Sequence, residues 1–535
     1  MTQICSSPAA KEQPTLFNWL FGSIQMFQRF WFALLTLVVF AAQAHPARAE
    51  PQDAVQLRIM AFNVWYGAEQ VSFPATIEAL KKADADIVGV AEPDGNLERL
   101  ALGAGYPYFD TRRNILSRYP IFDPGLGIRT ESAAAPYSIV GLDSDKLHAW
   151  IMVRPGKVVA IGNTHLSSDP YGPEAMRDGA GLKSLMTLEK RARLSEAQAL
   201  TPLAKLGTSG VPVFLTGDFN SPAPSDWNAA MQKARPDVIR YPVTWPATGA
   251  LIDAGLRDSY REAHPDPVKK PGFTWTAGMP HPFVRPRETS DRIDYVFVGG
   301  PAQTIKSEIL GEPNGPDVDI SVSPWPSDHR AVVSTFEVTP IDAPALISVS
   351  PRRIIRGQTF LVRGHEPASE IWSARIVPAG APISSARLAI VDEIGPWRPA
   401  VRFSSNELTP GEYDAVLIGR SGAELKRTRF AIATDNAPVI LKATALEIAA
   451  GKPVRAHWEN APGYRFDWIG VFKAGDPGVA NYVALAYTGA RFSGETDIPT
   501  RTNDGQLPAG DYELRLMLDD SQTTLARAPF RIRAK

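Results

Sequence analysis

Carboxylate, amide and imidazole residues recur at the ends of short apolar segments in the first 340 residues of this 535-residue chain. We expect each segment to be a strand that delivers its polar group at its carboxyl end, at a rim and not in the core. A single residue of this kind usually marks a turn. Six groups together instead indicate a polar cluster in a cleft. The groups contain Asn63, Glu92, Asn163–His165, Gly217–Asn220, Asp291–Tyr295 and Ser327–His329.

Any metal bound by this cluster would have oxygen ligands. The chain has one cysteine, Cys5, and its eight histidines form no HExxH or HxH pair, so a zinc site made of thiolates is excluded. Carboxylates and amides suit a hard cation such as Mg²⁺ or Mn²⁺. The net charge of -1 argues against a protein that coats nucleic acid by electrostatics alone, but not against an enzyme that cleaves it.

The elements that must position these groups alternate between strand and helix patterns. We expect amphipathic helices over 75–83 and 185–206, because the apolar residues in these segments recur at the spacing that places them on one face of a helix. Strands are predicted over 57–64, 86–91, 158–163, 211–216, 292–298 and 331–338. The alternation predicts an α/β enzyme core.

These segments resemble the endonuclease/exonuclease/phosphatase superfamily, which has the DNase-I-like fold. The matching motifs stand in the family's order over about 55–338 and are FNVWYG, DIVGVAE, NILSRYPI, GNTHL, LTGDFNS, DRIDYVF and SDHRAV. The combination of GDFN and SDH at this spacing is specific. The resemblance implies a four-layer α/β/β/α sandwich over 50–340, with two packed sheets, flanking helices and the active site at one rim.

The same resemblance implies a metal site made of Asn63, Glu92 and Asp328 that holds Mg²⁺ or Mn²⁺. It also implies that His329 is the general base that activates water, with Asp294 as the carboxylate that orients its ring.

Three further residues are expected to bind the reacting group. Asp218 and Asn220 would hold the phosphate or the attacking water, and Asp218 could instead protonate the leaving group. His165 would donate to a phosphate oxygen that gains charge. One departure from the family is Ala91 before Glu92, where the family often has Gln, so the adjoining substrate rim is expected to differ.

Each of the other notable side chains near the motifs has two possible roles. Trp65 and Tyr66 would stack on a base or sugar, or else pack the rim. Arg112, Arg113 and Arg118 are candidate phosphate contacts, or else ordinary solvated arginines.

The N-terminus carries an export signal. The apolar run 30–42 follows Arg29 and is too short for a membrane span, so we expect 1–49 to be a cleaved signal peptide and not an anchor. Met26 would give a leader of ordinary length and is the alternative start. The mature chain would be periplasmic or secreted, without a stable membrane span.

From residue 345 onward, short strand patterns alternate with Pro/Gly turns. LTPGEY at 408–413 recurs as LPAGDY at 507–512, which indicates a duplicated unit. We predict two Ig-like β-sandwiches, over 345–435 and 436–535. They would be spacers that stabilise the fold, or alternatively a module that binds a ligand or surface.

The sequence therefore predicts an exported, metal-dependent phosphoesterase that uses activated water, most readily a phosphodiesterase or nuclease. The alternatives are a sphingomyelinase-like phospholipid diesterase, or a phosphatase of inositol or sugar phosphates. A third alternative, from a different class, is an exported binding protein without catalysis.

Overall fold

The computed structural model describes residues 54–123, 147–275, 289–368, 371–390, 394, 400–479, 481–502 and 505–534. The predicted signal peptide lies outside these residues. The described residues belong to one unit of the chain that begins at Asp53. None of the helices formed by them has the length and apolar character needed to cross a membrane.

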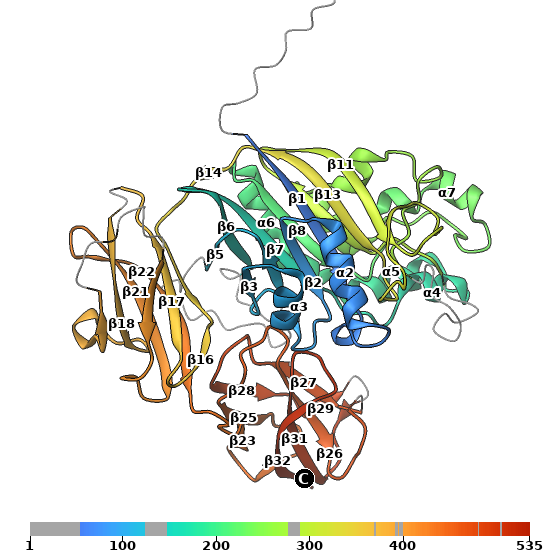
Figure 1. Cartoon of the computed structure of the whole chain (residues 1–535). Helices are drawn as coiled ribbons and strands as arrows, with labels where there is room; N and C mark the ends of the chain where they lie inside the picture. The colour runs from blue at the N-terminus through green and yellow to red at the C-terminus, as the bar shows by residue number, and fades with distance from the viewer. Residues whose placement is uncertain are drawn as a thin grey trace, which may run out of the picture. The chain divides into compact units, whose positions relative to one another are not determined.

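The first sheet of the described chain has seven strands in the order β12-β11-β13-β1-β2-β4-β3 (Figure 1). These strands are β1 (Val55–Asn63), β2 (Ile87–Ala91), β3 (Tyr108–Asp110), β4 (Ile115–Ser117), β11 (Ala302–Gly311), β12 (Val318–Ser321) and β13 (Ala331–Val338). Strand β1 is parallel to β2 and antiparallel to β13. Helices α2 (Phe73–Ala83) and α3 (Leu97–Ala104) pack against its outer face.

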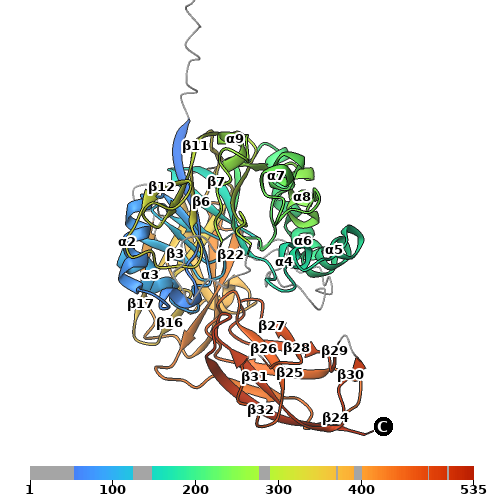
Figure 2. The same cartoon turned by 90° about the vertical axis from the view of Figure 1, so that its right-hand side faces the viewer.

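The second sheet, in the same described residues, follows the order β5-β6-β7-β8-β10-β9, with β14 beside β7. Its strands are β5 (Ile121–Phe122), β6 (His148–Arg154), β7 (Lys157–His165), β8 (Val213–Asp218), β9 (Arg257–Asp258), β10 (Asp294–Gly299) and β14 (Ile341–Asp342). The helices on this side are α4 (Gly172–Arg177), α5 (Leu182–Glu189), α6 (Ser195–Thr208), α7 (Ala229–Ala234), α8 (Pro246–Asp253) and α9 (Ser259–Ala263) (Figure 2). A π-helical turn joins α5 to α6, so the helix expected over 185–206 is a continuous but locally widened one.

The four layers follow from strands that are apolar on both faces. In β1, Leu57 and Ile59 point to the second sheet, where they pack with Ile161 of β7. Met60 and Phe62 point the other way and pack with residues of α2 and α3. A corresponding core lies between the second sheet and helices α6 and α8. The predicted α/β/β/α sandwich is therefore confirmed.

Two β-sandwiches follow, and their strand orders correspond. The first pairs sheet β15-β17-β20 with β16-β22-β21-β18-β19, and the second pairs β23-β25-β28 with β24-β32-β31-β26-β27. In each, a tyrosine after the repeated glycine donates its hydroxyl hydrogen to a carbonyl four residues earlier, Tyr413 to Thr409 at 2.9 Å and Tyr512 to Pro508 at 3.0 Å. The predicted duplication is visible in both topology and corner geometry.

The strands of the first sandwich are β15 (Leu346–Ser350), β16 (Arg353–Ile355), β17 (Thr359–His365), β18 (Trp372–Pro378), β19 (Leu388–Ala389), β20 (Ala400–Ser404), β21 (Gly411–Gly419) and β22 (Glu424–Ala433). Those of the second are β23 (Ile440–Ala443), β24 (Glu447–Ala449), β25 (Val454–Glu459), β26 (Trp468–Lys473), β27 (Ala484–Tyr487), β28 (Gly494–Ile498), β31 (Gly510–Met517) and β32 (Thr524–Arg533). The short strands β29 (Arg501–Thr502) and β30 (Gly505–Gln506) pair with each other and lie between β28 and β31 in the sequence.

Candidate active site

Four predicted site residues lie where parallel strands end. Asn63 ends β1 and Glu92 directly follows β2, its parallel neighbour. His165 ends β7 and Asp218 ends β8, and these two residues are register partners in a parallel pair. The carboxyl ends of parallel strands share one edge of a sheet, so each of the two sheets brings one pair of predicted site residues to its rim.

Two predicted site residues reach this rim by a different route. Asp294 begins β10, and His329 precedes β13, so the expectation that they stand at the carboxyl ends of strands is wrong. Strand β10 is antiparallel to β8 and places Asp294 opposite Asp218. Strand β13 is likewise antiparallel to β1. The reversal brings the amino ends of β10 and β13 to the rim formed by the carboxyl ends of their neighbours.

Asp218 lies at the centre of the cluster and is 1% exposed. Its Oδ2 accepts a hydrogen bond from the Asn63 amide at 3.0 Å. The Nε2 atoms of His165 and His329 both lie 3.6 Å from that same oxygen. Its Oδ1 accepts the main-chain N–H of Asn220 at 2.9 Å. Two imidazoles therefore flank one fixed carboxylate oxygen.

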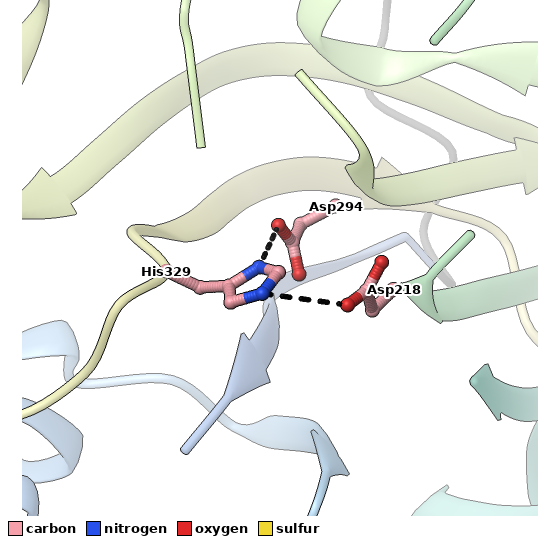
Figure 3. Close-up of side chains that lie close together, drawn as sticks. All are labelled: Asp218, Asp294 and His329. Atoms are coloured by element: carbon pink, nitrogen blue, oxygen red, sulfur yellow. Dashed lines mark hydrogen bonds and ion pairs between the residues drawn. The ribbon is translucent and has the colours of Figure 1, made fainter. Parts of the chain in front are cut away.

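His329 and Asp294 form a buried pair, shown together with Asp218 in Figure 3. The Nδ1 of His329 lies 2.9 Å from Asp294 Oδ2, while Asp294 Oδ1 is buried without a hydrogen-bond partner among the described residues. Burial opposes a charge on the ring, but the carboxylates of Asp294 and Asp218 outweigh it and raise the pKa of His329 above its ordinary value. Burial also raises the pKa of Asp294. The ring is thus oriented with Nδ1–H toward Asp294 and Nε2 toward Asp218.

The partly exposed Glu92 lies beside the buried Asn63. The Asn63 amide nitrogen donates to Glu92 Oε1 at 2.9 Å, and its Oδ1 accepts the main-chain N–H of Trp65 at 3.0 Å. The amide therefore has to turn before it can offer its oxygen to a metal. Glu92 Oε2 accepts the main-chain N–H of Tyr66 at 3.0 Å, and the Tyr66 ring is 52% exposed beside it.

The donor set predicted for the metal fits a hard cation. Burial, followed by the charge of Glu92, raises the pKa of the half-buried Asp328 to about 7, although His329 opposes the shift. Two carboxylates that disfavour each other's charge are stabilised when a divalent cation lies between them. Ligand atoms of Asp218, Asp294 and His329 also lie within 4.8 Å of one another, but both nitrogens of that imidazole face carboxylates. The set Asn63, Glu92 and Asp328 stays a prediction.

Several other residues of the motifs make contacts that hold the scaffold of the site together. Asn163 donates to Val90 O at 2.8 Å and so links the two sheets behind the rim. The Asn220 amide donates to Leu166 O at 3.0 Å, which ties the loop after β8 to the residue that follows His165. Arg292 is buried and pairs with two carboxylates. Those carboxylates are Asp226 and Asp258.

The three arginines considered as phosphate contacts are held elsewhere. Arg112 and Arg113 are buried, and Arg118 forms an ion pair at 2.5 Å on the surface. Their carboxylate partners are Asp123, Asp110 and Asp84. The structure therefore gives these guanidinium groups structural partners and does not bring them to the cluster.

Three acidic residues near the site were not predicted. Burial and the charges of Glu92, Asp519 and Asp520 raise the pKa of Asp94 to about 9. Asp94 lies two residues after Glu92, close to the substrate rim that was expected to differ from the family. Asp519 and Asp520 belong to the β31–β32 turn of the second sandwich, and no pattern in the sequence connects that turn to the catalytic motifs.

Comparison with known proteins gives concordant results. An uncharacterized protein of Caenorhabditis elegans is 28% identical over 304 aligned residues, which cover 52% of this chain and 91% of that protein. The crystal structure of an endonuclease/exonuclease/phosphatase from Beutenbergia cavernae, 16% identical, covers 70% of this chain and 99% of its own, with a TM-score of 0.34. The catalytic domain of Xenopus laevis APE2, 17% identical, covers 54% and 94%, with a TM-score of 0.32.

The family model described as Endonuclease/Exonuclease/phosphatase family matches residues 60–329, just over half of the chain. This range begins within β1 and ends at His329, so it contains every residue of the predicted site. The chain belongs to the endonuclease/exonuclease/phosphatase family.

Proposed function

We propose that the protein is an exported phosphoesterase that depends on a divalent cation and hydrolyses phosphodiesters, with nucleic acid as the first substrate to test. The observation that carries the proposal is the arrangement around Asp218, where two imidazoles lie 3.6 Å from one carboxylate oxygen and one of them is held by Asp294. General base catalysis needs such an oriented ring, because its free nitrogen must face the water that attacks.

Each side chain then has a task that its contacts support. His329 donates Nδ1–H to Asp294, and in the neutral form of the ring Nε2 takes a proton from the attacking water. Because the pKa of His329 is raised, the neutral form, and with it the rate, should increase with pH. His165 lies at the other side of Asp218 and would donate to a phosphate oxygen as negative charge develops there. Asp218 keeps both rings in place. When it is protonated, it would donate its proton to the leaving oxygen.

The cation would be held by Glu92 and Asp328, with Asn63 after its amide turns. When bound, it would neutralise negative charge on the phosphate and on the leaving oxygen. The carboxylates and amide present favour Mg²⁺ or Mn²⁺.

The test is hydrolysis by purified protein of supercoiled plasmid and, in parallel, of bis(p-nitrophenyl) phosphate. Each is measured with Mg²⁺, with Mn²⁺ and with EDTA. His329→Ala is the variant, and Asp342→Asn, an exposed change on β14, is the control. Activity that needs both metal and His329 supports the proposal. Equal activity of His329→Ala and parent on both substrates would refute the mechanism, whereas hydrolysis of neither substrate by the parent would favour the alternative of a non-catalytic binding protein.

A further inference from the structure

The second sandwich contacts the catalytic domain directly beside Glu92. Its β31–β32 turn presents Asp519, whose Oδ2 accepts the main-chain N–H of Gly95 at 3.0 Å. Leu518 packs so closely that its side chain lies 3.1 Å from the point where a Cβ on Gly95 would stand. Tyr464 donates its hydroxyl hydrogen to Gly95 O at 3.4 Å. The loop that carries Glu92 is therefore held from the sandwich side.

A second set of contacts anchors the same sandwich to the strands behind the site. Arg465 is 1% exposed, and its main-chain N–H donates to Thr111 O at 3.1 Å. Its guanidinium donates to the main-chain oxygen of Asn163, two residues before His165 on β7. A buried guanidinium needs hydrogen-bond acceptors in place of water, so the Asn163 carbonyl ties Arg465 to this position of the interface.

Asp520 directly follows Asp519, the residue that binds Gly95 in the loop of Glu92. Its main-chain N–H donates to Phe466 O at 3.1 Å, and its carboxylate accepts the Tyr487 hydroxyl at 3.4 Å. The side chain keeps contact with solvent. Surrounding protein raises the pKa of Asp520 to about 7, against the opposing charge of His165, and Glu92 adds to the increase. Asp520 is thus a solvent-accessible acid within electrostatic reach of both sides of the catalytic cluster.

We propose that the second sandwich forms one wall of the substrate cleft and that Asp520 is a residue that determines specificity. Its charge disfavours substrates that carry further phosphates along this wall, so compact phosphodiesters are preferred over internal bonds of long polynucleotides. This inference rests on the proposed function. The sandwich is then part of the active site and not a spacer.

The physical basis is repulsion between the Asp520 carboxylate and a further phosphate of the substrate. One unit charge near an incoming phosphate changes its binding by about 3–10-fold when the effective dielectric lies between that of water and protein. Salt screens the effect, because the Debye length falls from about 10 Å at 0.1 M to about 3 Å at 1 M ionic strength. The left-handed backbone of Asp520, with φ of 60°, also accepts asparagine readily.

The experiment compares kcat/KM for a single-stranded 20-nucleotide DNA with kcat/KM for bis(p-nitrophenyl) phosphate, in the full-length protein, at a pH above the pKa of about 7 so that Asp520 is ionised. Asp520→Asn should raise the ratio of the two values about 3–10-fold, and Asp520→Lys should raise it further. Asp511→Asn is the matched control, because it removes the same charge at the other end of β31, about 23 Å away. The control should keep the parent's ratio. The gain in Asp520→Asn should shrink in high salt.

A ratio in Asp520→Asn and Asp520→Lys equal to that of Asp511→Asn would overturn the inference, even if both substrates are hydrolysed. Failure of the proposed function looks different. In that case the parent hydrolyses neither substrate, or does so equally well after His329→Ala. A graded increase from Asp520→Asn to Asp520→Lys, with metal and His329 still required, supports both.

Discussion

Replacement of Asp294 by asparagine should change the orientation and tautomer of His329, and therefore catalysis, while it leaves the stability of the fold nearly unchanged. Asp294 is fully buried, and its Oδ2 lies 2.9 Å from the Nδ1 of His329. Asparagine fills the same volume, but its amide can donate to Nδ1. The ring hydrogen then moves to Nε2, which faces Asp218 and can no longer accept the proton of the attacking water.

A correctly placed general base contributes about 10²–10⁴-fold to rate. Asp294→Asn should therefore lower kcat by that factor, which corresponds to about 2.7–5.5 kcal/mol of barrier. The fold should change by no more than about 1 kcal/mol, because the substitution removes a buried charge whose Oδ1 has no partner.

The assay is kcat on bis(p-nitrophenyl) phosphate at saturating metal, beside the melting temperature of parent and variant. Asp342→Asn makes the same chemical change at an exposed carboxylate on β14 and should match the parent. If Asp294→Asn keeps kcat within about threefold of the parent, the carboxylate does not control the ring tautomer and the assignment of His329 as base is refuted.

Three further predictions concern metal, acid and packing. Glu92→Gln should raise the metal concentration for half-maximal activity at least about tenfold, measured by titration with Mg²⁺, because one anionic ligand is lost. Burial, with repulsion from Arg113, lowers the pKa of His148 to about 3 from 6.5. Because the unfolded chain takes up this proton first, stability is full above pH 6.5 and falls toward pH 3 by at most about 1.4 kcal/mol per pH unit; His148→Phe should flatten this slope in melting experiments. Gly89→Ala should cost about 1–3 kcal/mol in urea unfolding, because its Cβ would collide with Thr216 behind the site.

Each of these predictions has a clear contrary outcome. If the metal titration of Glu92→Gln is the same as that of the parent, Glu92 is not a metal ligand, and the buried group around Asp218 becomes the candidate metal site. An identical loss of stability in acid for parent and His148→Phe would assign the acid sensitivity to other groups. A Gly89→Ala variant as stable as the parent would show that the space between the two sheets is looser than the packing indicates.

Much of the catalytic domain could be predicted because its information is local. The alternation of Leu57, Ile59, Met60 and Phe62 identifies β1 and its two buried faces in the sequence itself. The repeat around Gly411 and Gly510 likewise indicates a duplicated sandwich.

The roles of individual polar residues were less visible, because residue type does not report direction. Asn163 and Arg292 stand in the same motifs as His165 and Asp294, yet their side chains support the scaffold. Which member of a motif faces the rim depends on the pleat and on the neighbouring strand. That pairing depends on residues far apart in the chain, so no single motif encodes it.

The sequence by itself determined the family, the order of the strands and the identity of the polar residues that end or precede them. Only the tertiary structure decided that Asp294 and His329 meet Asp218 through antiparallel neighbours. It alone also brought the β31–β32 turn of the second sandwich to Gly95, three residues after Glu92. Strand patterns reflect local alternation, whereas a contact between distant domains depends on two complete surfaces fitting together, and no short segment encodes that fit.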